Sequence, residues 1–192
     1  MDNAHATGGR GGLGEREMMG QTAEIVKRVP FSTGSFGIMD LRDLITPEGV
    51  FPSLKVKNKK QALQDLADRA AVLTGANPRR IFESLLQRER LGSTGIGRGI
   101  AIPHGKIADI KQIFTLFARL EEKIDFESMD GEPVDLIFLL LAPESAGADH
   151  LKALARISRL LRDPAAIDKL RGSKDRSALY SVLTEPLASH AA

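Results

Sequence analysis

The chain has 192 residues, enough for one globular domain with a sizeable core, alone or with a tail. Hydrophobic residues make up 42% of it, charged residues 27%, and the formal net charge is only +2, so a nucleic-acid-binding face is not required. The absence of cysteine excludes disulfides, thiolate metal sites and thiol nucleophiles. Because no apolar run approaches the ~20 residues of a membrane span and no secretory signal is visible, we expect a cytoplasmic protein without membrane insertion.

Residues 1–38 differ in composition from the rest of the chain, because they are rich in glycine and carry few apolar side chains. Such a segment cannot offset the entropy lost on ordering, so we predict a flexible N-terminal extension. A regulatory arm is the alternative interpretation. The globular domain is expected over 39–185, with Met39 as an alternative start of translation, and residues 186–192 are expected to form a flexible tail.

The spacing of apolar residues predicts the elements of this domain in chain order. A short helical turn is expected at 40–45. Asn58 and Asn77 are residues typical of helix N-caps, and the second is followed by Pro78 at the first helical position. They predict one helix ending near Leu73, closed by Gly75, and a second helix that carries Arg88 near its end.

The remaining elements are four strands and three further helices. The strands are predicted at 50–56, 99–103, 113–120 and 134–142, and the helices at 149–162, 164–170 and 175–183. The last strand is apolar along almost its whole length, which is typical of a strand covered on both faces. This order of elements indicates an α/β fold with a single sheet and helices on both faces.

His104 is the first candidate for chemistry, because it lies between Pro103 and Gly105 at the end of a predicted strand. Proline restricts the backbone before the histidine, and glycine leaves room for another molecule to approach. An imidazole with a reference pKa of about 6.5 is mostly neutral at pH 7, so one ring nitrogen can attack phosphorus. From the residues alone, a solvated or structural histidine is the open alternative.

Four other residues could assist a phosphoryl group on His104. Arg88 offers a planar fork of donors, while Ser93 and Thr94 offer hydroxyls from a glycine-rich turn. His150 is predicted near the start of a helix, a favourable place for an anion, and in line with that helix's apolar face. Each has a plainer alternative: Arg88 could be a solvated residue at a helix end, and His150 a core histidine bonded to a carbonyl.

Several well-defined nucleotide-binding and catalytic motifs are absent from the sequence. Between Gly99 and Lys106 the two glycines are separated by five residues instead of the four of a P-loop, and Ile107 stands where a magnesium-binding Ser or Thr is needed. The glycine spacing at 95–99 does not match the dinucleotide fingerprint. The zinc H-E-x-x-H and serine-hydrolase G-x-S-x-G motifs are missing as well.

The segment from Arg88 to Lys106 reads R-E-R-L-G-S-T-G-I-G-R-G-I-A-I-P-H-G-K. It resembles the active-site segment of the fructose- and mannitol-type enzyme IIA proteins of the bacterial phosphotransferase system. Its sequence is most similar to that of the nitrogen-regulatory IIA branch. The similarity extends from about Leu41 to Glu185 and includes V-D-L-I-F-L-L-L-A-P and D-H-L-K-A-L. The resemblance implies a three-layer α/β/α fold with a mixed β-sheet flanked by helices.

The resemblance also implies a phosphotransferase role. His104 would accept a phosphoryl group on Nε2 from a phosphohistidine of a histidine-containing phosphocarrier protein. Arg88 and His150, which match the family's arginine and second histidine, would hold the phosphate, with no cofactor and no metal. In the regulatory branch, the phosphorylation state of the IIA protein would alter its binding to target proteins, such as potassium transport or sensor proteins. Members of this branch are linked to nitrogen metabolism and potassium transport.

Two other functions stay open. The protein could be a sugar-specific IIA component that passes its phosphate to a IIB domain of a sugar permease, although the chain carries no IIB or membrane segment of its own. It could also be a binding module that is never phosphorylated.

Overall fold

The computed structural model describes residues 41–185. The predicted extension at 1–38, the alternative start at Met39 and the predicted tail at 186–192 lie outside these residues. The described part begins with two short 3-10 turns, η2 (Leu41–Asp43) and η3 (Pro47–Gly49), and only the first of them was predicted.

The next two helices begin at the predicted caps. The side chain of Asn58 accepts a backbone N–H bond from the first turn of α2 (Lys59–Thr74), and Asn77 does the same for α3 (Pro78–Arg90). At the end of α2, Gly75 adopts a φ of +75°, which glycine reaches without steric cost. Both helix starts are therefore set by local side-chain bonds that the sequence already showed.

Six strands form one sheet within the described residues, in the order β1-β5-β6-β3-β2, with β4 also paired to β6. They are β1 (Val50–Leu54), β2 (Gly95–Gly97), β3 (Ile100–Ala101), β4 (His104–Lys106), β5 (Phe114–Ile124) and β6 (Val134–Ala142). The central pair β5 and β6 is antiparallel, whereas β1 runs parallel to β5, and both β3 and β4 run parallel to β6. The sheet is mixed, as the resemblance implied.

The segment around the histidine differs from the single strand predicted at 99–103, because it contains the three short strands β2, β3 and β4. Residues 97–99 have φ angles of +90°, +57° and +77°, and they reverse the chain between β2 and β3. Pro103 has no N–H to donate, and the pairing with β6 is interrupted there and resumes in β4. His104 therefore begins a strand instead of following one.

A short 3-10 turn, η4 (Glu144–Ala146), and three helices complete the described chain. The helices are α4 (Ala148–Leu160), α5 (Pro164–Gly172) and α6 (Arg176–Thr184). Each begins and ends within two residues of its predicted bounds. Among residues 41–185, no helix is long and apolar enough to span a bilayer.

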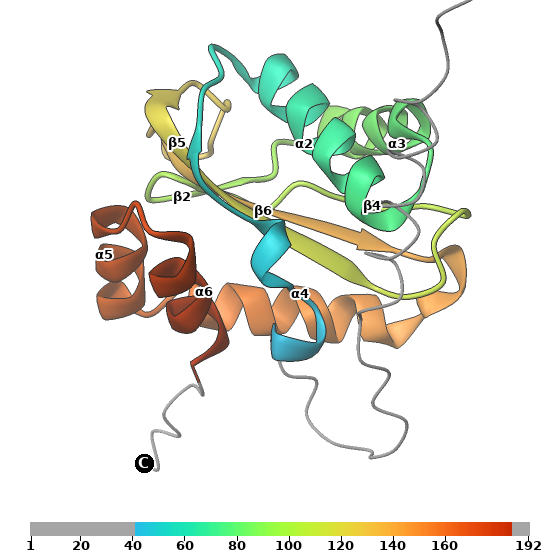
Figure 1. The fold of residues 1–192 in the computed structure, drawn as a ribbon. Coiled ribbons are helices and arrows are strands. Elements are labelled where there is room, and N and C mark those ends of the chain that lie inside the picture. The colour runs from blue at the N-terminus through green and yellow to red at the C-terminus, as the bar shows by residue number, and fades with distance from the viewer. Residues whose placement is uncertain (1–40, 186–192) are drawn as a thin grey trace, which may run out of the picture. The chain divides into compact units, whose positions relative to one another are not determined.

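Alternate residues of β6 face opposite helical layers. One set packs with α2 and α3, and consists of Ile137, Leu139 and Leu141. The other set packs with η2 and with α4, α5 and α6, and consists of Leu136, Phe138 and Leu140. All six side chains are 0% exposed, so β6 is covered on both faces as predicted. Figure 1 shows α2 and α3 on one side of the sheet and α4 to α6 on the other, which confirms the three-layer α/β/α prediction.

Candidate functional site

The backbone of His104 is held between β6 and α3. As the first residue of β4, His104 pairs with Leu140, and the carbonyl of Pro103 accepts a hydrogen bond from Leu140 N at 3.0 Å. On the other side, the Ser84 hydroxyl of α3 donates to the carbonyl of Lys106 at 3.1 Å. The histidine is therefore mounted on a strand that two neighbouring elements fix, and its side chain is partly buried.

Two hydrogen bonds assign the tautomer of the His104 ring. Nδ1 lies 2.8 Å from the carbonyl oxygen of Ile102, and Arg88 Nε donates to Nε2 at 2.9 Å. Because a carbonyl only accepts and a guanidinium only donates, Nδ1 carries the proton and Nε2 carries a lone pair. The ring is therefore neutral, with Nε2 as its nucleophilic nitrogen.

Electrostatics favour the same neutral form. Burial lowers the pKa of His104 most, and the positive charge of Arg88 lowers it further, whereas the bond to Ile102 and the charge of Glu89 raise it. The net shift of the pKa is downward from the ordinary value. The proton is thus kept off Nε2 at neutral pH.

Arg88 lies in the last turn of α3 and contacts both the histidine and the following loop. Besides its bond to His104, it donates from Nη1 to the carbonyl of Gly92 at 3.0 Å. Within residues 41–185, its Nη2 group has no hydrogen-bond partner. The guanidinium therefore keeps donors available for an anion at Nε2 of His104.

His150, the third residue of α4, lies beside His104. The two ring centroids are 5.7 Å apart and the ring planes are inclined at 49°. His150 Nε2 is buried without a hydrogen-bond partner among the described residues, a costly condition that calls for an explanation. Burial lowers the pKa of His150, and nearby His104 and Lys106 lower it further.

The structure does not bring the hydroxyls of Ser93 and Thr94 to His104. Ser93 donates to the carbonyl of Phe126 at 2.8 Å, and Thr94 donates to the carboxylate of Glu89 at 2.5 Å. A hydroxyl has one proton, so in this arrangement neither can donate to a phosphate on His104. The predicted phosphate contacts of these two residues would require their hydroxyls to leave these partners, and the contacts stay a prediction.

Glu89 is a buried carboxylate next to Arg88 in the chain, and the sequence analysis did not single it out. Its side chain is only 4% exposed, although it is a carboxylate in the last turn of a helix, where the dipole disfavours negative charge. The sequence feature that could have identified Glu89 is its unfavourable position near the end of the predicted helix, between Arg88 and Arg90.

We refer to His104, Arg88 and His150 as the His104 cluster.

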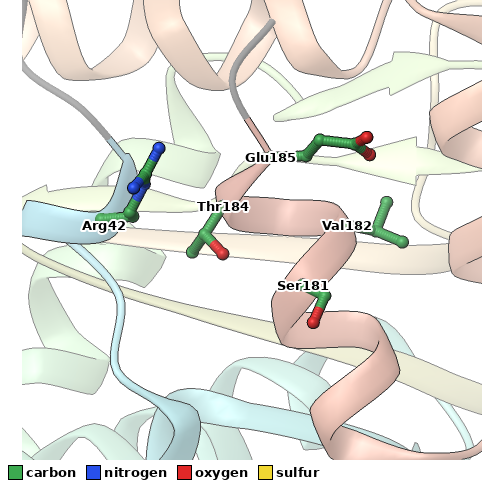
Figure 2. Close-up of a pocket in the computed structure, with 5 residues that line it drawn as sticks. All are labelled: Arg42, Ser181, Val182, Thr184 and Glu185. Carbon is green, nitrogen blue, oxygen red and sulfur yellow. The ribbon is translucent and has the colours of Figure 1, made fainter.

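Metal-binding clusters and surface pockets are the other features that could mark a functional site. Within residues 41–185, no group of three or more His, Asp or Glu side chains could hold a metal ion. A surface depression of about 440 Å³ lies between η2 and α6 (Figure 2) and is lined by Arg42, Ser181, Val182, Thr184 and Glu185. The hydroxyls of Ser181 and Thr184 donate to carbonyls of their own helix, and none of the five residues belongs to the cluster.

The site combines a neutral, partly buried imidazole with a guanidinium and a second histidine. Comparison with known proteins identifies the family of the chain. The model of the phosphoenolpyruvate-dependent sugar phosphotransferase system EIIA 2 family matches residues 43–185. The nitrogen regulatory protein of Bradyrhizobium diazoefficiens is 64% identical over 153 residues, which cover 80% of this chain and 100% of that protein. The chain belongs to the EIIA 2 family of the phosphotransferase system, so the predicted resemblance is confirmed.

Solved structures agree with this assignment. The nitrogen regulatory protein IIA-Ntr from Neisseria meningitidis superposes with a TM-score of 0.71 at 32% identity, over 74% of this chain and 97% of that chain. The mannitol IIA of Escherichia coli gives a TM-score of 0.62 at 22% identity, over 72% of this chain and 98% of that chain. At that identity the mannitol protein supports the fold alone. The relatives of higher identity include nitrogen regulatory proteins and also the fructose-specific EIIA component of Haloferax volcanii, which is 35% identical over 77% of this chain and 98% of that protein.

Proposed function

We propose that the protein is a phosphohistidine carrier, in which Nε2 of His104 accepts a phosphoryl group from a phosphohistidine of a histidine-containing phosphocarrier protein. The observation that supports this most is the tautomer: Nδ1 is committed to the Ile102 carbonyl, which leaves the Nε2 lone pair for attack. The new bond joins Nε2 to phosphorus while the donor's N–P bond breaks, and its electron pair returns to the donor imidazole. The Nδ1 proton of His104 stays in place throughout.

Arg88 and His150 are assigned to the phosphoryl oxygens. Once phosphorus occupies Nε2, the Arg88 N–H that had bonded to the lone pair is released and, with the free Nη2 donors, can bind the oxygens. The buried, unpartnered Nε2 of His150 would donate to the same group, which gives that nitrogen the acceptor it lacks here. Neither role needs a metal or a cofactor.

We further propose that the phosphorylated and unphosphorylated forms act as a regulator of nitrogen metabolism and potassium transport, by binding target proteins such as potassium transport or sensor proteins. The support is the 64% identity with a protein named as a nitrogen regulatory protein over that protein's full length. The alternative, a sugar-specific IIA component that passes its phosphate to a IIB domain of a permease, has in its favour the 35% identity with a fructose-specific EIIA component.

The proposal is tested by incubating the full chain with phosphoenolpyruvate, enzyme I and the carrier, and by following acid-labile, base-stable phosphate. His104→Ala should abolish labelling. Arg88→Ala and His150→Ala should each slow it by roughly 10²-fold, the usual effect of losing one donor at a developing charge. Arg90→Ala, which changes an exposed arginine in the same helical turn, is the matched control and should label at the wild-type rate. Equal labelling of all the variants would refute the assignment.

A second step separates the regulator from the sugar carrier. Purified IIB domains of the fructose and mannitol type are added to the phosphorylated protein. A regulator should keep its phosphate for much longer than a sugar-type IIA treated in parallel. Loss of the phosphate at the rate of the sugar-type IIA would favour the alternative.

A further inference from the structure

The carboxylate of Glu89 is buried at a place where burial is costly. It lies in the last turn of α3, the end of a helix at which the dipole disfavours an anion, and its side chain is 4% exposed. It forms no hydrogen bond with His104, so it is not part of the cluster described above. A buried charge in such a position needs strong partners or a specific role.

Glu89 has three strong bonds. The backbone N–H of Thr94 donates to Oε1 at 3.0 Å, and the Thr94 hydroxyl donates to Oε2 at 2.5 Å. The ammonium of Lys59, from α2, lies 2.9 Å from Oε1 and is also 2.8 Å from Glu127. The carboxylate thereby ties the loop after α3 to both helices of that layer.

These bonds continue to the histidine ring through the backbone. The Thr94 carbonyl accepts a hydrogen bond from Ile102 N at 2.9 Å, and the Ile102 carbonyl accepts the Nδ1 proton of His104, with 2.8 Å between nitrogen and oxygen. An unbroken series of contacts therefore runs from Glu89 through Thr94 and Ile102 to the imidazole. The same loop carries the Gly92 carbonyl that holds Arg88.

We propose that Glu89 is a positioning residue for phosphoryl transfer, which acts through Thr94 and Ile102 to hold the His104 ring in its Nδ1–H tautomer and in reach of Arg88. The inference deepens the proposed function and rests on it for its kinetic consequence. It also gives Thr94 a role, as the link between the carboxylate and the strand that leads to the histidine. Glu89 touches neither the ring nor the phosphoryl group, so it is not a catalytic residue.

The charge of Glu89 has a separate effect that can be measured. Glu89 raises the pKa of His104, whereas burial and Arg88 lower it, and on the other side His150 lies next to His104 with Lys106 close to His150. Removing the charge but keeping the shape should therefore lower the pKa of His104 further. This effect does not depend on whether the protein is ever phosphorylated.

The test uses Glu89→Gln and Thr94→Val in the full chain. Glutamine keeps the shape of glutamate without its charge, and its NH2 group replaces one of the two acceptor oxygens. The bond of Oε1 to Lys59 and the bond of Oε2 from the Thr94 hydroxyl therefore cannot both be kept as they are. Valine keeps the shape of threonine without its hydroxyl. Thr94→Ser keeps the hydroxyl and serves as the rescue, and Glu83→Gln, an exposed carboxylate of the same helix, is the matched control. Thermal melting establishes that each variant is folded.

Nitrogen-15 NMR of the unphosphorylated protein reports the tautomer and the pKa of His104. In Glu89→Gln we expect a smaller Nδ1–H fraction and a lower pKa, and in Thr94→Val a smaller Nδ1–H fraction. Labelling should slow by roughly 10- to 100-fold in both, since small misplacements of a reacting group are costly. Thr94→Ser and Glu83→Gln should match the wild type in every measurement.

The inference is overturned if folded Glu89→Gln and Thr94→Val keep the wild-type His104 tautomer, whatever their labelling rates and whatever pKa shift the lost charge of Glu89 produces. A slower rate alone could reflect general loosening. If the wild-type protein itself is not labelled, the proposed function fails. The NMR comparison would still decide whether Glu89 positions the ring.

Discussion

The pKa values of His104 and His150 are lowered by the same leading cause, the burial of two imidazoles side by side. Arg88 lowers the pKa of His104 further, and His104 and Lys106 lower that of His150. The proposed attack on phosphorus requires a neutral His104 ring, so the lowered pKa of His104 widens the pH range in which its Nε2 would be available. Because both pKa values are lowered, protonation of either histidine lowers the free energy of unfolding.

Stability should therefore fall on acidification. The unfolded chain takes up protons on these two histidines near pH 6.5, whereas the folded chain takes them up only at lower pH, so the unfolded state binds more protons in between. We expect the free energy of unfolding to decrease as the pH falls from 7 to 5. In His104→Gln/His150→Gln the decrease should be smaller. Urea denaturation at several pH values measures both, and an equally steep decrease in the double variant would contradict this account.

At the scale of elements, the distance between α3 and β4 determines whether Arg88 can reach His104. A Cβ atom added to Gly105 would lie 2.5 Å from Ser84 Oγ and 3.6 Å from Leu85 Cδ2. Glycine is favoured here by close approach, since any larger residue would force the Ser84 side chain or the strand to shift. The close packing of α3 against β4 therefore helps to bring the arginine within hydrogen-bond distance of the histidine.

Gly105→Ala should push β4 away from α3 and lengthen the Arg88–His104 contact. We expect a loss of about 1–3 kcal/mol in the free energy of unfolding, the usual cost of overpacking, together with slower phosphorylation. Adding Ser84→Ala, which removes the nearest atom, should restore part of both. Denaturant unfolding and the labelling assay measure the two effects.

Gly75→Ala provides the matched control for this prediction. It forces alanine into a left-handed conformation at the end of α2, where a Cβ would meet nothing within 4 Å. It should cost about 1–2 kcal/mol without slowing phosphorylation. If both glycine variants slowed labelling equally, the α3–β4 contact would not be the cause.

At the scale of the whole described fold, one arginine connects the C-terminal helical layer to the sheet. Arg171 of α5 donates to Asp135 of β6 from Nε at 3.0 Å and from Nη2 at 2.9 Å, and Nη2 also donates to the Arg98 carbonyl at 2.6 Å. In return, Arg119 of β5 donates from Nε to the Arg171 carbonyl at 3.0 Å. The turn between β2 and β3, which precedes the histidine, is therefore attached to α5.

Arg171→Met should lower the free energy of unfolding by about 2 kcal/mol. Breaking a fully buried pair costs about 3–5 kcal/mol, but the Arg171 side chain is 33% exposed, so solvent screening reduces the figure. Lys169→Met, at an exposed position of the same helix, should change stability by less than about 0.5 kcal/mol. Denaturant unfolding compares the two, and equal effects would show that the network adds nothing specific.

The sequence by itself determined the elements whose signals are local. The caps at Asn58 and Asn77, the apolar strand β6 and the five helices α2 to α6 were predicted correctly, because a cap or an apolar run acts over a few residues. The motif around His104 was long enough to predict the family, which the match over residues 43–185 confirms. The assignment of His104 as phosphoryl acceptor stays a prediction.

Only the tertiary structure decided which groups face the imidazole. Ser93 and Thr94 are close to His104 in sequence, yet their hydroxyls bond to Phe126 and Glu89, whereas His150 is distant in sequence and its ring lies 5.7 Å away. Local sequence also could not show that Pro103 would separate two strands paired to the same β6. The physical reason is that a side chain's direction and partners depend on how helices and strands pack across the sheet, and spacing along the chain does not contain that packing.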